Sequence, residues 1–276
     1  MMSNRISIEE ALARPNARHV IGISGGKDSA ALAIHIRNNY PEIHEKVEYF
    51  FTDTGAELEE VLNFIDSLES YLGKPIARLS SDKPFEHWLK VHNDYLPSPR
   101  QRWCTVKLKL KPFEEFVGDD EVISYVGIRA DENREGYVSQ KDTISAVFPF
   151  IEDGLVREDV FQILEDTVGI PKYYEWRSRS GCFFCFFQRQ DEWLGLKRNH
   201  PELFEKAKEI EKKSGNGYTW VQGKTLDEVV AHAEKREKEK GIIFKTSSTS
   251  EEKWQKVLAN MEEDDADDQA CIICSL

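Results

Sequence analysis

The chain lacks several features that mark other classes of protein. No apolar run among its 276 residues reaches the ~18 residues that a membrane-spanning helix needs. Its first residues show no basic segment followed by an apolar one, as a secretory signal would. We therefore expect a cytoplasmic protein with no membrane partner. Hydrophobic residues still make up 40% of the chain, which is enough to build a core.

Positive charge is also scarce. The 37 lysines and arginines face 50 acidic residues, so the net charge is −13, which disfavours a nucleic-acid binder. Six acidic residues, however, lie between residues 262 and 268, and without them the net charge is −7. A polyanionic substrate is therefore not excluded. One basic strip could contact phosphates, face a nucleotide or simply be solvated: Arg100, Arg102, Lys107, Lys109 and Lys111.

Cysteine is rare but patterned. Four of the five cysteines form two C-x-x-C pairs, one near residue 183 and one at residues 271–274. In a chain of this size and expected location, such spacing indicates metal, cluster or sulfur chemistry more than disulfides. The five residues are Cys104, Cys182, Cys185, Cys271 and Cys274.

Strand-like and helix-like segments alternate in the first half of the chain. This order predicts an α/β fold with a mostly parallel sheet flanked by helices. The expected strands are 18–24, 46–55, 74–81 and a segment from 121 that runs into a polar loop, and the expected helices are 29–38 and 58–73. In the second helix the predicted buried face is Leu58, Val61, Leu62, Ile65, Leu68 and Leu72.

The character of the sequence changes after residue 190. We expect residues 1–190 to form the α/β domain and 191–261 to form a helical C-terminal extension. One charged helix is expected at 226–240, and another where Ser248 and Glu251 have capping-box spacing. Residues 262–276 are expected to be an acidic, flexible tail that ends in C-x-x-C.

Three polar loops each follow a predicted strand. They are SGGKDS (24–29), TDTGAE (52–57) and GIRADENR (127–134). Because ligands of parallel sheets bind at the carboxyl ends of the strands, these loops should meet at one edge.

The first loop has the composition of an anion site. Its glycines allow a sharp turn and a close approach, and the following helix presents free N–H groups at its start. Ser24 and Ser29 add hydroxyl groups and Lys27 adds charge. The spacing differs from the Walker loop, which requires G-x-x-x-x-G-K-[ST].

SGGKDS resembles the PP-loop, S-G-G-x-D-S, of the N-type ATP pyrophosphatases. That superfamily includes GMP synthetase, tRNA-thiolating enzymes and phosphoadenylylsulfate (PAPS) reductases. Four further segments resemble the PAPS reductase branch: FTDTGAE, RWCTVKLKLKP, VGIRADENR and FPFIEDGLVREDV. In the last of them Gly154 stands where the branch usually has tryptophan. The resemblance covers about Arg18 to Phe187 and implies an adenine nucleotide alpha hydrolase-like fold.

The resemblance also implies residue roles. The loop would bind the phosphates of ATP with Mg²⁺, and Lys27, Asp28 and Arg129 would carry catalysis. A salt bridge from Arg129 to Asp131 or Glu132 is the structural alternative. The residues implied to bind the nucleotide are Ser24, Gly25, Gly26, Lys27, Asp28, Ser29, Asp53, Thr54, Gly55, Arg129 and Arg134.

Cys104, Cys182 and Cys185 are the candidate metal ligands. If they converge at the strand ends, they could hold a [4Fe–4S] cluster with one iron open or bound by Cys271 or Cys274. Structural zinc is the alternative, although none of the seven histidines lies near either C-x-x-C pair in sequence. The cysteines could also be redox-active, or small buried residues with no metal.

We expect an ATP-dependent sulfur-transfer enzyme, in which an acceptor oxygen is adenylated, pyrophosphate leaves and sulfur displaces AMP. The alternative is a PAPS reductase-type oxidoreductase with a cysteine nucleophile, but the reductase tail motif E-C-G-[IL]-H is missing. A third class is a nucleotide-binding regulator without turnover. Among relatives, the chain is most similar to the ATP pyrophosphatase subunit of bacterial DNA phosphorothioation systems of the Dnd and Ssp types. That similarity implies a cysteine desulfurase or other sulfur donor and DNA as acceptor; a homodimer is one candidate for the oligomeric state.

Overall fold

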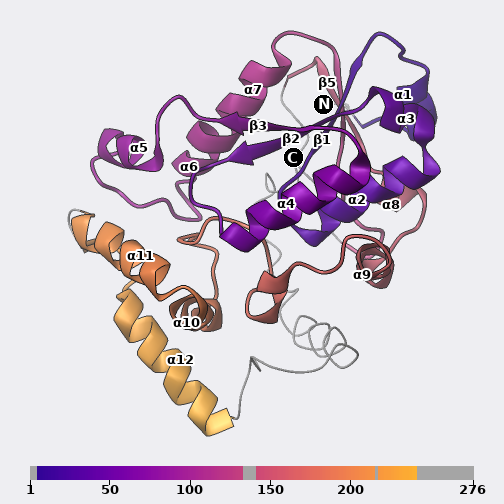
Figure 1. Cartoon of the computed structure of the whole chain (residues 1–276). Coiled ribbons are helices and arrows are strands. Elements are labelled where there is room, and N and C mark those ends of the chain that lie inside the picture. The colour runs from indigo at the N-terminus through magenta and orange to yellow at the C-terminus, as the bar shows by residue number, and fades with distance from the viewer. Residues whose placement is uncertain (1–4, 133–140, 215–216, 241–276) are drawn as a thin grey trace.

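The protein is an α/β structure built on a single parallel sheet (Figure 1). The computed structural model describes residues 5–132, 141–214 and 217–240. The strand order is β3-β2-β1-β4-β5, and every neighbouring pair is parallel. This confirms the predicted fold class, with one strand, β5, that was not predicted. The strands are β1 (Arg18–Gly22), β2 (Glu48–Asp53), β3 (Ile76–Ser80), β4 (Val122–Tyr125) and β5 (Ile144–Val147).

Helices cover the sheet and extend beyond it. In the α/β part they are α1 (Ile8–Leu12), α2 (Lys27–Asn39), α3 (Pro41–Lys46), α4 (Glu59–Leu72), α5 (Phe85–Val91), α6 (Trp103–Thr105), the π-helix η1 (Val106–Leu110), α7 (Lys111–Val117), α8 (Pro149–Glu152), α9 (Arg157–Glu165) and the 3₁₀-helix η2 (Lys172–Glu175). The extension contains α10 (Gln190–Asn199), α11 (Pro201–Lys213) and α12 (Leu226–Lys240).

The two faces of the sheet pack against different helices, because successive side chains of a strand point to opposite sides. On β1, Ile21 belongs to the large core that contains α2, α4 and α9. Its neighbour Val20 points the other way and packs with Phe113 and Val117 of α7. Every residue of β1 after Arg18 is buried, as expected of a strand that is covered on both faces.

Helix α4 shows where the periodicity argument succeeds and where it fails. Val61, Ile65 and Leu68 are fully buried, as predicted. The prediction for Leu62 is wrong, because its side chain is 37% exposed while Phe64 is buried instead. A rotation of about 100° per residue places Leu62 at the margin of the stripe, where the core no longer covers it.

Helix α2 begins directly at the first polar loop. Its N-cap is Gly26, which has no side chain to cap the free N–H groups of the first turn. The helix is otherwise buried along most of its length by small and branched residues such as Ala30, Ala33 and Ile34. Its start is therefore firmly held while its first amides are left for other partners.

A stack of aromatic rings joins the extension to the α/β part. Trp103 stacks on Phe85 with ring centroids 5.1 Å apart, and Phe85 lies 4.4 Å from Phe184. Phe184 stacks on Trp220 at 5.2 Å, and Trp220 lies 6.5 Å from Trp193 of α10. These separations fall in the favourable range for aromatic pairs. The hydrophobic core is thus continuous across residue 190, where we place the domain boundary.

Glu211 organises the segment that connects α11 to α12. Its two carboxylate oxygens accept hydrogen bonds from the backbone N–H groups of Trp220 and Leu226, each at 3.0 Å. Burial raises the pKa of Glu211, and the two N–H groups oppose that rise. One carboxylate therefore fixes both Trp220 in the aromatic stack and the beginning of α12.

In the described part of the chain, no helix has the length and apolarity that crossing a membrane requires.

The role of Glu211 can be tested by replacing it with alanine. Two buried N–H groups would lose their acceptor, so we expect Glu211→Ala to lower the free energy of unfolding by about 1–3 kcal/mol. The control is Glu209→Ala, since that side chain is exposed and makes only a 3.9 Å ion pair with Lys213. Urea unfolding would measure both; equal stability of the two variants would contradict the assignment.

Candidate functional site

The loop after β1 adopts a conformation that only glycine accommodates at its second position. Gly25 has φ +75°, and a Cβ added there would lie 2.5 Å from Cγ1 of Val61. At Gly26 an added Cβ would lie 2.9 Å from the Ser180 hydroxyl oxygen. The two glycines are therefore required by a left-handed turn and by close contacts on both sides.

The serines of this loop close it from within. The Ser24 amide donates to the Ser29 hydroxyl oxygen at 3.1 Å, and the Gly26 amide donates to the Ser24 hydroxyl oxygen at 3.2 Å. The Ser29 hydroxyl in turn donates to the Gly26 carbonyl at 3.2 Å. Ser24 and Ser29, which we predict to bind phosphate, thus also preorganise the loop.

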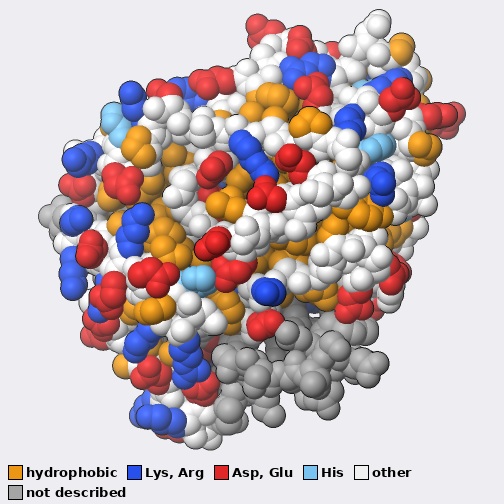
Figure 2. Space-filling model, in the orientation of Figure 1, with side chains coloured by type: hydrophobic (Ala, Val, Ile, Leu, Met, Phe, Trp, Pro, Cys, Tyr) orange, Lys and Arg blue, Asp and Glu red, His pale blue; other side chains and the backbone are white. Residues whose placement is uncertain are grey.

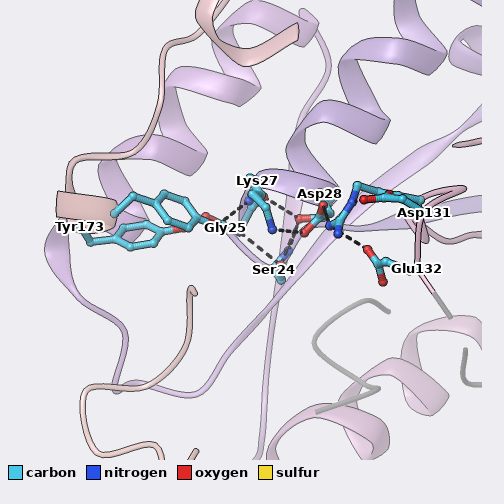
Figure 3. Close-up of polar contacts among 11 residues, drawn as sticks. Ser24, Gly25, Lys27, Asp28, Asp131, Glu132 and Tyr173 are labelled. Atoms are coloured by element: carbon cyan, nitrogen blue, oxygen red, sulfur yellow. Dashed lines mark hydrogen bonds and ion pairs between the residues drawn. The ribbon is translucent and has the colours of Figure 1, made fainter. Parts of the chain in front are cut away.

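Two cations and a carboxylate meet at the start of α2 (Figure 3). Lys27 Nζ lies 2.8 Å from Asp28 Oδ2, and Arg129 Nη1 lies 2.9 Å from Asp28 Oδ1. Burial by itself would raise the pKa of Asp28, but the charges of Lys27 and Arg129 lower it to about 2. Asp28 is therefore ionised throughout the physiological range and holds both cations in place.

Arg129 makes further ion pairs on its other side. It lies 3.0 Å from Asp131 and 2.7 Å from Glu132, so the salt bridges named above as the structural alternative do form. Its guanidinium is buried, and although burial would lower its pKa, Asp28 and Glu132 raise it. Arg129 is thus a permanent charge fixed between the loop after β4 and the start of α2.

Gly127 allows these two loops to approach each other. A Cβ at this position would lie 2.9 Å from the carbonyl oxygen of Asp28. The residue belongs to the GIRADENR segment, but spacing alone does not reveal this contact.

Two tyrosines from distant sequence hold the backbone of the loop. The Tyr173 hydroxyl donates to the Gly25 carbonyl at 2.7 Å, and the Lys27 amide donates to the Tyr174 hydroxyl oxygen at 3.0 Å. Burial raises the pKa of Tyr173 well above its ordinary value, so it stays a donor. Sequence reasoning missed both residues, because only the YY pair in η2 marks them and no motif precedes it.

The loop after β2 is tied together by one carboxylate. Glu57 accepts from the Thr54 hydroxyl at 2.7 Å and from the Thr54 amide at 3.2 Å. The Gly55 amide donates to Asp53 Oδ1 at 2.8 Å. Burial raises the pKa of Glu57, and Lys109 opposes the rise. Asp53, Thr54 and Gly55 therefore lie at the sheet edge beside the first loop, since β2 neighbours β1.

One of the three candidate cysteines, Cys182, contacts this second loop. The Cys182 sulfur lies 3.1 Å from the Thr54 hydroxyl oxygen and 4.0 Å from Glu57. Burial raises the pKa of Cys104 to about 12, with Cys185 adding to the rise; the pKa of Cys182 is raised by burial, Glu57 and Cys185. Cys185 thus contributes to the rise in pKa of both other thiols.

The donor set suits a thiophilic metal, but it is not arranged around one. Within the described residues, no three His, Cys, Asp or Glu side chains are placed as a metal site requires. The residue types fit nonetheless, because Cys104, Cys182 and Cys185 are half-buried thiols, which are the soft donors that such a metal prefers. The metal assignment stays a prediction.

Arg177 fixes the segment that carries Cys182. Its guanidinium donates to the carbonyl of Gly181 at 2.9 Å and to that of Cys182 at 2.8 Å. Glu192, fully buried, accepts from the amide and hydroxyl of Ser178 at 2.7 and 2.6 Å. Burial would raise the pKa of Glu192, but Arg177 and these hydrogen bonds lower it.

The structure divides the basic strip between different partners. Lys107 lies 4.8 Å from the centroid of Trp88, and Lys111 pairs with Glu115 at 3.6 Å. The charge of Lys109 opposes the rise in the pKa of Cys104, whereas Arg102 lies over Phe187. The π-helix η1, whose turns are wider than those of an α-helix, separates these side chains. On the face in Figure 2, acidic and basic side chains are interspersed.

Arg134, Cys271 and Cys274 lie outside the described residues, as do the predicted helix near Ser248 and the acidic tail.

Residues 18–151 match the phosphoadenosine phosphosulfate reductase domain. The match covers all five strands of the sheet. It ends before Tyr173 and before Cys182, so it does not include the second half of the site.

Two uncharacterized proteins of Methanocaldococcus jannaschii are similar to the chain. One is 29% identical over 220 residues, covering 74% of this chain and 44% of that protein; the other is 25% identical over 205 residues, covering 70% and 47%. The chain thus spans about half the length of these relatives. An uncharacterized 37.8 kDa protein of Escherichia phage 186 is 26% identical over 267 residues, covering 70% and 74%.

Two solved structures are similar at lower identity. The phosphate complex of the PAPS reductase of Candida auris is 14% identical, with a TM-score of 0.42, covering 58% of this chain and 79% of that one. The NMN synthetase of Francisella tularensis is 12% identical, with a TM-score of 0.38, covering 92% and 88%.

The tyrosine contacts can be tested by removing single hydroxyl groups. We expect Tyr173→Phe and Tyr174→Phe each to weaken binding of MgATP by about 10-fold, because the Gly25 carbonyl or the Lys27 amide loses its partner and the loop loosens. Tyr218→Phe is the control, since Tyr218 belongs to the extension and its ring packs edge-on against Tyr95 of the α/β part. Calorimetric titration would measure the affinities; three equal values would refute the role of η2.

Proposed function

We propose that the chain is an ATP-dependent sulfur-transfer enzyme. The observation that carries this proposal is the adjacency of an anion-type loop and the half-buried Cys182 thiol at one sheet edge. Thr54 joins them, because it follows β2, the neighbour of β1, and its hydroxyl lies 3.1 Å from the Cys182 sulfur. A nucleotide held by the loop would thus have a sulfur site beside it.

The first half-reaction would be adenylation. An acceptor oxygen attacks the α-phosphorus of ATP, the bond to the pyrophosphate oxygen breaks, and pyrophosphate leaves with the electron pair. The loop amides, Lys27 and Arg129 would stabilise the charge that develops, with Mg²⁺ offsetting the charge of the phosphates. Asp28 would act as a positioning residue, since it holds both cations at 2.8 and 2.9 Å.

The raised pKa values of the thiols favour a role as metal ligands over a role as free nucleophiles. The nucleophilic form of cysteine is the thiolate, and burial raises the pKa of Cys104 to about 12 and also raises that of Cys182. Coordination to a metal would remove those protons. When bound, a [4Fe–4S] cluster would supply a soft site for sulfur, held by Cys104, Cys182 and Cys185, with zinc as the alternative ion.

The proposed donor and acceptor are more specific: sulfur comes from a cysteine desulfurase or another donor protein, and the acceptor is DNA. It is supported by the motif resemblance described above. The second candidate, reduction of PAPS by a cysteine, is favoured by the domain match at residues 18–151. The two candidates differ in their products, because only the first releases pyrophosphate from ATP.

Asp28 provides the direct test of nucleotide activation. We expect Asp28→Asn to lower ATP–pyrophosphate exchange by about 10²-fold or more, because Lys27 and Arg129 lose the charge that positions them. Asp66→Asn is the control, since Asp66 makes an exposed ion pair with Arg78. Normal exchange in Asp28→Asn with an unchanged circular dichroism spectrum would refute the assignment. Turnover of PAPS with thioredoxin would favour the reductase.

Cys182 provides the test of the metal centre. We expect Cys182→Ser, purified without oxygen, to lose most of its bound metal, because one of three thiol ligands is replaced by a weak one. Iron, zinc and sulfide analysis together with the visible spectrum distinguishes a cluster from zinc. The double variant Cys271→Ser/Cys274→Ser tests whether the tail supplies a ligand. Metal content in Cys182→Ser equal to that of the natural protein would exclude the site.

A further inference from the structure

Two arginines from distant parts of the sequence lie against one aromatic ring beside the thiols. The guanidinium carbon of Arg102 is 5.0 Å from the centroid of Phe187, and that of Arg179 is 5.8 Å from the same centroid. Each distance is that of a cation–π contact. Two positive charges therefore share one half-buried phenylalanine.

In the part of the chain that the structure describes, neither arginine forms an ion pair. Arg102 donates to the Pro99 carbonyl at 3.2 Å, and Nη1 of Arg179 is buried without a hydrogen-bond partner. Arg18, by contrast, pairs with both Glu48 and Asp120. An unsatisfied buried donor is costly, and two unneutralised cations at one ring repel each other, so this arrangement suits an added anion.

The position of the pair relates it to both halves of the site. Arg102 is two residues before Cys104 in the chain. Arg179 immediately precedes Ser180, whose hydroxyl lies 2.9 Å from where a Cβ on Gly26 would be. The two arginines therefore belong to segments that lead to the thiols and to the anion-type loop.

We propose that Arg102, Arg179 and Phe187 form a binding site for a phosphate ester of the acceptor substrate. Arginine recognises phosphate with paired N–H donors, and an aromatic ring beside it offers a stacking surface for a base. An acceptor that is itself anionic would be repelled by ATP, so it needs local positive charge at this place. The acceptor role rests on the proposed function, whereas the binding of a phosphate ester does not.

The test uses the full chain and two probes. A labelled short single-stranded DNA is titrated by fluorescence anisotropy, and inorganic phosphate is titrated by calorimetry. We expect Arg102→Gln/Arg179→Gln to bind the DNA about 10-fold or more weakly. We also expect the slope of log affinity against log salt to fall by about 0.7 for each phosphate that the variant no longer neutralises. The matched control is Lys107→Gln, which removes one charge from a cation–π contact with another ring, that of Trp88.

The outcomes separate the two sources of phosphate. Weaker DNA binding in Arg102→Gln/Arg179→Gln but not in Lys107→Gln supports the site with a nucleic-acid acceptor. Phosphate binding without DNA binding, abolished in the double variant, supports it with a small phosphate ester. The proposal is overturned if the natural protein binds neither probe, if the double variant binds both normally, or if Lys107→Gln is weakened as much. If the double variant does not fold, each single variant is measured instead.

Titration of MgATP in the same variants keeps this proposal apart from the proposed function. We expect Arg102→Gln/Arg179→Gln to bind MgATP as the natural protein does, because Asp28, Lys27 and the loop are untouched. Absence of MgATP binding in the natural protein would overturn the proposed function and leave the phosphate-ester site to be decided by the two probes.

Discussion

The ion pair between Asp28 and Arg129 is the contact on which the geometry of the site depends. It joins the first turn of α2 to the segment after β4, two elements that are about 100 residues apart in sequence but neighbours at the sheet edge. Arg129 is buried, so removing either partner would upset the charge balance of a desolvated place, where Lys27, Asp131 and Glu132 would remain. The pair thus gives the loop a single arrangement, and Lys27 follows from it through its own contact with Asp28.

The segment 173–183 extends this arrangement to the thiols. Tyr173 and Tyr174 hold the backbone of the loop at one end of the segment, and at the other end the Phe183 amide donates to the Ala56 carbonyl at 2.8 Å. Arg177 lies between them and fixes the carbonyls of Gly181 and Cys182. A displacement of the loop would therefore be transmitted to the cysteine region over a short, well-connected path.

The parts of the site that the sequence predicts are those that are contiguous in the chain. The strand–loop–helix around SGGKDS and the parallel sheet follow from local pattern, and they are confirmed by the strand order and by the domain match. The roles of Tyr173, Tyr174 and Gly127 could not be predicted in this way. They act on backbone carbonyls and amides of a remote loop, and a backbone partner leaves no trace in the residue type on the other side.

The basic strip illustrates the opposite failure, in which neighbours in sequence are not neighbours in function. Its residues are close in the chain, but around the π-helix between α6 and α7 Lys107 lies over Trp88 whereas Lys111 pairs with Glu115. The grouping that the structure offers instead, Arg102 with Arg179, spans 77 positions and is joined by the ring of Phe187. Charge patterning in a sequence therefore locates cations but not the surfaces they share.

The aromatic stack has an optical consequence. Trp103, Trp193 and Trp220 are three of the six tryptophans in the chain, and all three are shielded from solvent in one continuous array of rings. Undocking of α10–α12 would bring water to these indoles and shift their emission to longer wavelengths. The protein thus carries an intrinsic, label-free reporter of whether its C-terminal helices are packed against α5 and α6.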